Sequence, residues 1–221
     1  MKALDLFCCA GGASAGLVQA GFTVTGVDIE PQPNYPWTFV QASALGLSVE
    51  FLSEFDFIWA SPPCQFATAY KRRHAHVKPA MNLIPATRDL LDAAGVPYVI
   101  ENVAGARHEL RDPVMLCGSS FGLDVRRHRY FETSRFDIEP VACDHGWQTP
   151  RFPPAGNRVN LRSTVEVGVW RIPMDVQHAA MGGLEWRARR ELSQAIPAPY
   201  SAHIAQCFLE RATAPNLELR A

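Results

Sequence analysis

Short apolar runs alternate with segments of helical spacing in the first half of the chain. The spacing predicts helices over residues 13–20 and 85–94, each followed by a glycine that can end a helix. Runs of aliphatic and β-branched side chains predict strands over residues 3–7, 23–29, 55–60 and 97–103. This alternation indicates an α/β fold, in which helices cover both faces of a doubly wound, mostly parallel sheet.

The regular pattern is lost between residues 140 and 185, where prolines, glycines and polar residues interleave. We expect this stretch to be a small irregular insertion and not a second domain. Helical spacing returns over residues 200–213. The chain is therefore expected to consist of a core, residues 1–139, the insertion 140–185, and a C-terminal part, 186–221, that returns to the core.

Composition favours a soluble globular protein. The 221 residues are 48% hydrophobic and 19% charged, and the formal net charge is -1. No apolar run reaches the roughly 18 residues of a membrane span, and the N-terminus lacks the pattern of a signal peptide. We therefore expect a cytoplasmic protein with no membrane partner, in which the six cysteines are reduced. The near-neutral charge does not by itself indicate a nucleic-acid partner.

Residues suited to chemistry follow four of the predicted strands. They are residues 7–12, Asp28, residues 61–65 and the pair Glu101-Asn102. The carboxyl ends of parallel strands meet at one edge of a sheet, and ligands of doubly wound folds bind there. The sequence therefore predicts one site that gathers all four segments.

The first two segments suit a nucleotide-like ligand. Gly11 and Gly12 would let the backbone approach a ligand closely, and the helix that follows would offer free N–H groups. A plain tight turn is the alternative. Asp28 could accept both hydroxyl groups of a ribose, whereas a solvated aspartate in a turn would give the same pattern.

The third segment carries a candidate nucleophile. Pro62 and Pro63 stiffen the chain immediately before Cys64. A cysteine is a strong nucleophile once it is ionised, although a lone cysteine is more often a small core residue.

The fourth segment carries a candidate proton-transfer group. Glu101 ends an apolar strand, and burial would raise the pKa of its carboxyl group. Arg127 and Arg129 are two positions apart, so on a strand they would share a face, and one of them could pair with Glu101. A basic surface patch is the alternative.

The order of the motifs is more informative than any one of them. Asp5-Leu6-Phe7 with Gly11-Gly12 comes first, and it is followed by Ser61-Pro62-Pro63-Cys64-Gln65, Glu101-Asn102-Val103, Arg127-His128-Arg129-Tyr130-Phe131 and Gln194-Ala195-Ile196-Pro197. This series strongly resembles the DNA cytosine-C5 methyltransferases, especially the compact enzymes of bacteriophages and actinobacteria, over about residues 3–134 and 191–210. The resemblance implies a sheet of the S-adenosylmethionine-dependent methyltransferase type. It also implies a catalytic and cofactor-binding core, a short target-recognition region at 140–185, and a bacterial or phage-infected host cell.

The resemblance implies roles for the reactive residues. Cys64 would add to C6 of a flipped-out cytosine so that C5 can accept a methyl group. Glu101 would hold the N3 edge of the base, and Arg129 would position Glu101 and the base. Arg127 matches the outer arginine of the same motif. Further contacts to the base or the DNA are expected from Pro63, Gln65, Asn102, Tyr70, Lys71, Arg72 and Arg73. We expect the loop that contains the last four to be mobile without substrate.

The resemblance also implies a site for S-adenosylmethionine. Phe7 and Ile29 would pack on the two faces of adenine, and Asp28 would bind the ribose. The remaining lining is expected from Cys8, Gly11, Gly12, Pro62, Gln194 and Ala195. Ser43 stands where the family often has an aspartate for the adenine amine, and Ser193-Gln194 replaces a Gly-Asn pair, so a donor bulkier than methyl is an open alternative.

Three other functions stay open. One branch of the family methylates transfer RNA. Exocyclic-amino methyltransferases use a motif that begins like Ser61-Pro62-Pro63, but its fourth residue is aromatic where this chain has Cys64. A DNA-binding protein without activity is disfavoured, because Cys64, Glu101, Arg127 and Arg129 are all present.

The expected partner is double-stranded DNA, bound by a monomer. Because the target-recognition region is short, specificity is expected to be short or loose, or an accessory protein supplies the rest. Cys143 and His145 could bind a metal, but two ligands without a second pair do not make a site, so we expect no metal.

Overall fold

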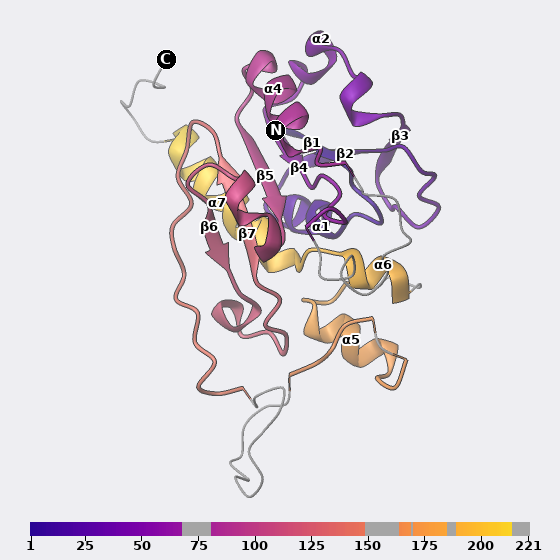
Figure 1. The fold of residues 1–221 in the computed structure, drawn as a ribbon, viewed down its shortest axis with the longest axis vertical. Helices are drawn as coiled ribbons and strands as arrows, with labels where there is room; N and C mark the ends of the chain where they lie inside the picture. Colours follow the sequence, from indigo (N-terminus) through magenta and orange to yellow (C-terminus); the bar gives the residue numbers. More distant parts are fainter. Residues whose placement is uncertain (68–80, 149–163, 169, 185–188, 214–221) are drawn as a thin grey trace, which may run out of the picture.

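The computed structural model describes residues 1–67, 81–148, 164–168, 170–184 and 189–213 (Figure 1). Tyr70, Lys71, Arg72 and Arg73, with the loop predicted to be mobile, lie outside these residues. No helix within the described ranges is long and apolar enough to cross a membrane.

A seven-stranded sheet forms the centre of the molecule, with the strand order β3-β2-β1-β4-β5-β7-β6. The strands are β1 (Lys2–Leu6), β2 (Thr23–Asp28), β3 (Thr38–Gln41), β4 (Phe57–Ala60), β5 (Tyr98–Asn102), β6 (Val114–Leu116) and β7 (Arg129–Thr133). Within the described sheet, β7 alone runs opposite to the other strands, and it is antiparallel to both β5 and β6. The predicted doubly wound, mostly parallel sheet is confirmed.

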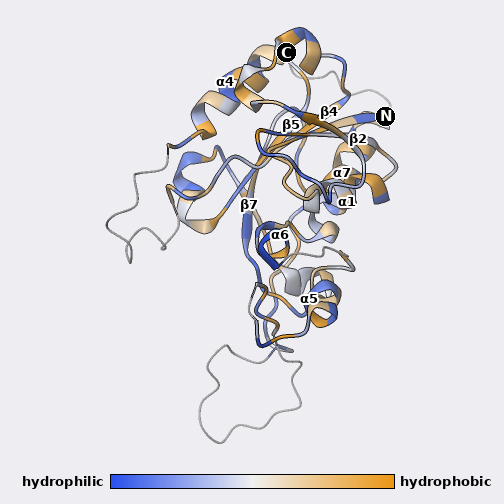
Figure 2. Ribbon diagram, turned by 90° about the vertical axis from the view of Figure 1, so that its right-hand side faces the viewer, coloured by the Kyte–Doolittle hydropathy of each residue, from blue (hydrophilic) through white to orange (hydrophobic). Residues whose placement is uncertain are grey.

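Helices cover both faces of the sheet, and each face has its own apolar core. Helices α1 (Gly12–Gln19) and α7 (Ala198–Thr213) pack on one face, where Phe57 and Val99 meet Leu17 and Phe208. Helices α2 (Val49–Leu52) and α4 (Ile84–Ala94), with the short turn η1 (Ala44–Gly46), cover the other. Because both faces are covered, the central strands are largely apolar, as the colouring of β4 and β5 in Figure 2 shows.

The close packing of α1 against α7 depends on a glycine. A Cβ atom at Gly16 would lie 2.1 Å from the carbonyl oxygen of Ala198 and 2.2 Å from Oγ of Ser201. Only a residue without a side chain lets the two helices approach this closely. The contact brings the C-terminal part of the chain back to the core, beside the turn that follows β1.

The insertion is more ordered than the sequence pattern predicts. Residues 140–185 were expected to be irregular, but helix α5 (Met174–Ala180) forms within them. The helix is attached through an apolar cluster in which Ala180 and Met181 pack with Leu192 of α6 (Arg189–Gln194). Two further short helices, η2 (Ala104–Glu109) and η3 (Gly118–Phe121), connect the last strands.

Candidate active site

A large pocket lies at the carboxyl ends of the parallel strands. Its volume is about 810 Å³, within the range of small-molecule sites. It is lined by the turn after β1, the ends of β2 and β5, the loop after β4, the start of β7, and helix α6 with the segment that follows it. The lining includes the predicted residues Phe7, Cys8, Gly12, Asp28, Ile29, Pro62, Pro63, Cys64, Gln65, Glu101, Arg129, Gln194 and Ala195. The prediction that these segments meet is therefore correct.

The loop that carries Cys64 is fixed to the neighbouring strand. Asn102, which is almost fully buried, donates a hydrogen bond from Nδ2 to the carbonyl oxygen of Pro62 (2.9 Å). Its Oδ1 accepts one from the backbone N–H of Val103 (3.0 Å). Asn102 was predicted to contact substrate, but it does not line the pocket. Its hydrogen bond connects β5 to the loop that carries Cys64.

Glu101 presents a buried carboxyl group to the pocket beside Arg129. Oε1 of Glu101 lies 3.1 Å from Nε of Arg129, an ion pair outside hydrogen-bonding geometry, and this oxygen has no hydrogen-bond partner among the described residues. Burial raises the pKa of Glu101, whereas Arg129, Arg127 and a hydrogen bond with Ser61 oppose the rise. The result is a carboxyl group with a raised pKa, whose Oε1 accepts no hydrogen bond among the described residues.

Cys64 is partly buried in the same electrostatic environment. Burial, followed by the nearby carboxylate of Glu101, raises the pKa of its thiol, and Arg129 and Arg127 lower it. The thiol therefore keeps its proton more firmly than a free cysteine while Glu101 is ionised. Neutralising Glu101 would remove one of the two main causes of the rise and favour the thiolate.

Arg127 lies elsewhere than predicted. Strand β7 begins at Arg129, and Arg127 precedes it in a left-handed conformation (φ 37°), so the two arginines do not share a strand face. The guanidinium of Arg127 donates hydrogen bonds to the carbonyl oxygens of Ala195 (3.0 Å) and Ser193 (2.6 Å). Arg127 thus fixes the segment that closes the pocket, and it reaches Glu101 only through its charge.

The other end of the pocket is built from the turns after β1 and β2. The carboxylate of Asp28 accepts hydrogen bonds from the backbone N–H groups of Cys9 and Glu30, both at 3.0 Å, which hold the two turns together. Ile29 exposes 65% of its surface at the pocket wall, so an apolar face is available there.

Two predicted cofactor residues do not line the pocket. Gly11 adopts a left-handed conformation (φ 83°), and a Cβ atom there would lie 2.8 Å from the ring of Trp37, so this glycine serves the turn. Ser43 precedes η1 and also lies outside the pocket lining.

Asp5 is a pocket residue that we did not single out from the sequence. Its Oδ2 accepts a 2.5 Å hydrogen bond from Ser14, which also contacts the hydroxyl of Tyr35 at 2.8 Å. Its Oδ1 is buried and has no hydrogen-bond partner among the described residues. Burial is the main cause that raises the pKa of Asp5 to about 7. A charged residue within the apolar run of residues 3–6 was the available clue.

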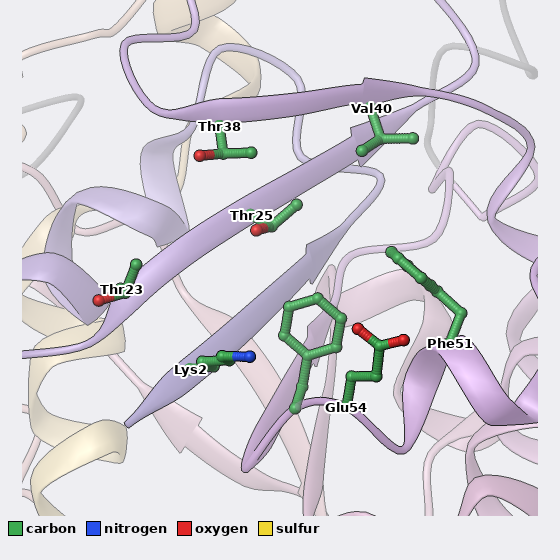
Figure 3. Close-up of a pocket in the computed structure, with 8 residues that line it drawn as sticks. Lys2, Thr23, Thr25, Thr38, Val40, Phe51 and Glu54 are labelled. Carbon is green, nitrogen blue, oxygen red and sulfur yellow. The ribbon is translucent and has the colours of Figure 1, made fainter.

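A second hollow, drawn in Figure 3, is a poorer candidate. Its volume is about 310 Å³, and it lies over β1, β2 and β3 beside α2. Thr23, Thr25 and Thr38 face Phe51 and Glu54 across it. None of the predicted site residues lines it.

Comparisons with known proteins support the fold. No protein-family model matches the chain, and no curated protein does. A candidate DNA modification methyltransferase encoded within an E. coli prophage matches with a TM-score of 0.67 and 16% identity, over 97% of this chain and 100% of that one. The Entamoeba histolytica methyltransferase EhMeth matches with a TM-score of 0.60 and 11% identity, over 97% and 99% of the two chains. The S. pombe methyltransferase Dnmt2 matches with a TM-score of 0.58 and 14% identity, over 97% of this chain and 100% of that one. The predicted fold of the S-adenosylmethionine-dependent methyltransferases is thus confirmed.

Proposed function

We propose that the protein is a DNA cytosine-C5 methyltransferase that uses S-adenosylmethionine. One observation carries the proposal: Cys64, Glu101 and Arg129 meet at one pocket, which also receives the turns after β1 and β2. A thiol beside a buried carboxyl group and a guanidinium is the set of groups that addition to a cytosine ring needs. The likeness in fold to the prophage protein, a candidate DNA modification methyltransferase, supports a nucleic-acid substrate.

The residues at the other end of the pocket fit S-adenosylmethionine. Phe7 and Ile29 would contact the adenine, and Asp28 the ribose. The unpartnered Oδ1 of Asp5 would accept the ammonium group of the methionine part, which would also favour the ionised form of that carboxyl. When bound, S-adenosylmethionine supplies an electrophilic methyl group.

Glu101 and Cys64 would act together on a base that has been flipped out of the duplex. Burial raises the pKa of the Glu101 carboxyl group, so Glu101 would be suited to donate a proton toward N3 of the cytosine. The Cys64 thiol would lose its proton to solvent water, and the resulting thiolate would form a bond to C6, which makes C5 nucleophilic. After methyl transfer, loss of the C5 proton to a base would restore the ring and break the bond between sulfur and C6, and N3 would return its proton to Glu101. Arg129 would keep Glu101 in place through the ion pair.

The exocyclic-amino alternative is less well supported. In that chemistry Ser61 would have to face the amino group of the base. The Ser61 hydroxyl instead accepts a hydrogen bond from Nε1 of Trp59 (2.9 Å) and hydrogen-bonds Glu101. Because these contacts occupy Ser61, we propose that it orients Glu101.

Nucleoside mass spectrometry tests the proposal. Duplex DNA and transfer RNA are incubated separately with S-adenosylmethionine and the wild-type protein, Cys64→Ala or Cys207→Ala. The expected product is 5-methylcytosine in DNA with the wild type and Cys207→Ala, whose cysteine lies on α7 away from the pocket, and none with Cys64→Ala. Methyl groups on an exocyclic nitrogen, or product in transfer RNA alone, would overturn it.

A further inference from the structure

Four metal-binding side chains meet at the end of the β6–β7 pair. Cys117 directly follows β6, and His128 directly precedes β7, so the antiparallel pairing of Leu116 with Arg129 brings them together. Cys143 and His145 reach the same place from the chain after β7. One ligand atom from each of the four lies within 4.8 Å of all the others. None of them lines the candidate active site.

The distances within this cluster suit a tetrahedral ion. Sγ of Cys143 lies 3.4 Å from Nε2 of His128 and 3.3 Å from Nε2 of His145. Sγ of Cys117 lies 3.2 Å from Nε2 of His145. Zinc bonds of about 2.3 Å to sulfur and about 2.0 Å to nitrogen give a tetrahedron whose sulfur-to-nitrogen edge is about 3.5 Å. The three contacts are close to that value.

The surroundings keep the four side chains in place. The Ser119 hydroxyl donates a hydrogen bond to Sγ of Cys117 (3.1 Å), as outer residues commonly do for metal ligands. The rings of His128 and His145 are nearly parallel, 17° apart, with their centroids separated by 5.3 Å. A Cβ atom at Gly118 would lie 2.1 Å from the carbonyl oxygen of Val125, so glycine is needed beside Cys117.

We propose that Cys117, His128, Cys143 and His145 form a structural zinc site. Two thiolates and two imidazoles are a ligand set typical of structural zinc, and with four protein ligands the ion has no open position for catalysis. The expectation of no metal rested on the lack of a second ligand pair beside Cys143 and His145. The fold supplies a second ligand pair. Cys117 lies 26 positions before Cys143, and His128 lies 17 positions before His145.

The site would fix two parts of the molecule. Cys143 is exposed and belongs to a segment with few buried apolar residues, so zinc would attach the start of the 140–185 insertion to the sheet. His128 immediately precedes Arg129, the partner of Glu101. Zinc would therefore also hold the start of β7, although no ligand touches the pocket.

Metal analysis tests this proposal without any methyl-transfer assay, so its failure is distinguishable from failure of the proposed function. Protein purified without chelators should contain about one zinc per chain by inductively coupled plasma mass spectrometry. Cys143→Ser and His145→Asn should lose it. Cys207→Ser is the matched control, because Sγ of Cys207 also lies near a histidine, 3.9 Å from Nε2 of His203, and this variant should keep its zinc, as should Cys64→Ala.

Cobalt substitution gives a second readout on the wild-type chain, which does not depend on the folding of a variant. Tetrahedral thiolate coordination should produce intense visible ligand-field bands and a thiolate-to-cobalt charge-transfer band, both absent in Cys143→Ser. No metal in the wild type, zinc that is lost in Cys64→Ala but kept in Cys143→Ser, or a disulfide between Cys117 and Cys143 in protein kept under reducing conditions would overturn the proposal.

Discussion

Replacement of Arg88 by methionine should strongly destabilise the protein. Arg88, on α4, donates hydrogen bonds to Oε1 (2.7 Å) and Oε2 (2.6 Å) of Glu132 on β7, and a third to the carbonyl oxygen of Glu109 (2.7 Å). Arg88 is 7% exposed and Glu132 is 1% exposed, so solvent screens this pair very little. In Arg88→Met the Glu132 carboxylate would keep only the backbone N–H of Arg111, at 2.8 Å from Oε2.

The expected cost follows from this burial. Leaving one charge of a buried pair without its partner costs about 3–5 kcal/mol, a large part of the roughly 5–15 kcal/mol that stabilises a typical domain. Urea unfolding followed by circular dichroism at pH 7 measures it. With a slope of about 2 kcal/mol per molar urea, the midpoint should fall by about 2 M.

Two further variants separate the buried charge from lost packing. Arg111→Met removes an exposed ion pair with Asp92 (3.2 Å), and it should cost less than about 1 kcal/mol. Arg88→Met combined with Glu132→Gln should recover much of the loss, because no buried charge is then left unpaired. A cost for Arg88→Met as small as that of Arg111→Met, or a double variant no more stable than Arg88→Met, would refute the reasoning.

Three other variants test the pocket. Glu101→Gln should lower turnover by about 10²- to 10⁴-fold, because the amide cannot transfer a proton. The affinity for S-adenosylmethionine, measured by calorimetry, should not change. Near-normal turnover would contradict the role of Glu101 in proton transfer. Asp28→Ala should weaken cofactor binding more than DNA binding, and the reverse order, measured by the same titrations, would count against the ribose assignment. Asp5 has a folded-state pKa of about 7 against an ordinary value of 3.8, so between these values the folded state holds a proton that the unfolded chain has released. Its contribution to stability is therefore complete below about pH 4 and lost as the pH rises through 7. Asp5→Asn should flatten this decline in the free energy of unfolding with pH, measured by urea unfolding. Parallel pH profiles for the variant and the wild type would argue against this assignment of Asp5.

The sequence was most informative where structure follows from short-range patterns. The buried strands and the two glycine-terminated helices could be predicted because parallel strands covered on both faces are apolar throughout. The meeting of Asp28, Cys64 and Glu101 followed from the topology alone, since Asp28 and Glu101 lie at the carboxyl ends of strands and Cys64 lies in the loop that follows one. Strand β3 was missed because it is a four-residue edge strand whose side chains are only partly buried.

Features that depend on long-range packing could not be predicted. The spacing of Arg127 and Arg129 would put both on one face if they lay on a strand, but Arg127 has a left-handed backbone and donates hydrogen bonds to residues 193 and 195 of the returning C-terminal part. The hydrogen bond from Asn102 to the carbonyl oxygen of Pro62 likewise joins residues 40 positions apart, so it could not be predicted from the sequence. The second ligand pair, Cys117 and His128, is brought to Cys143 only by the antiparallel pairing of β6 with β7.

Covalent trapping tests the central claim most directly. Duplex DNA with 5-fluorocytosine at its target positions cannot lose a C5 proton, so a thiolate bonded to C6 should stay bonded after methyl transfer. The account predicts a denaturation-resistant complex of protein and DNA that requires S-adenosylmethionine, forms with the wild type and Cys207→Ala, and maps to the peptide containing Cys64. A complex that persists in Cys64→Ala, or 5-methylcytosine formed from ordinary DNA by Cys64→Ala, would contradict it.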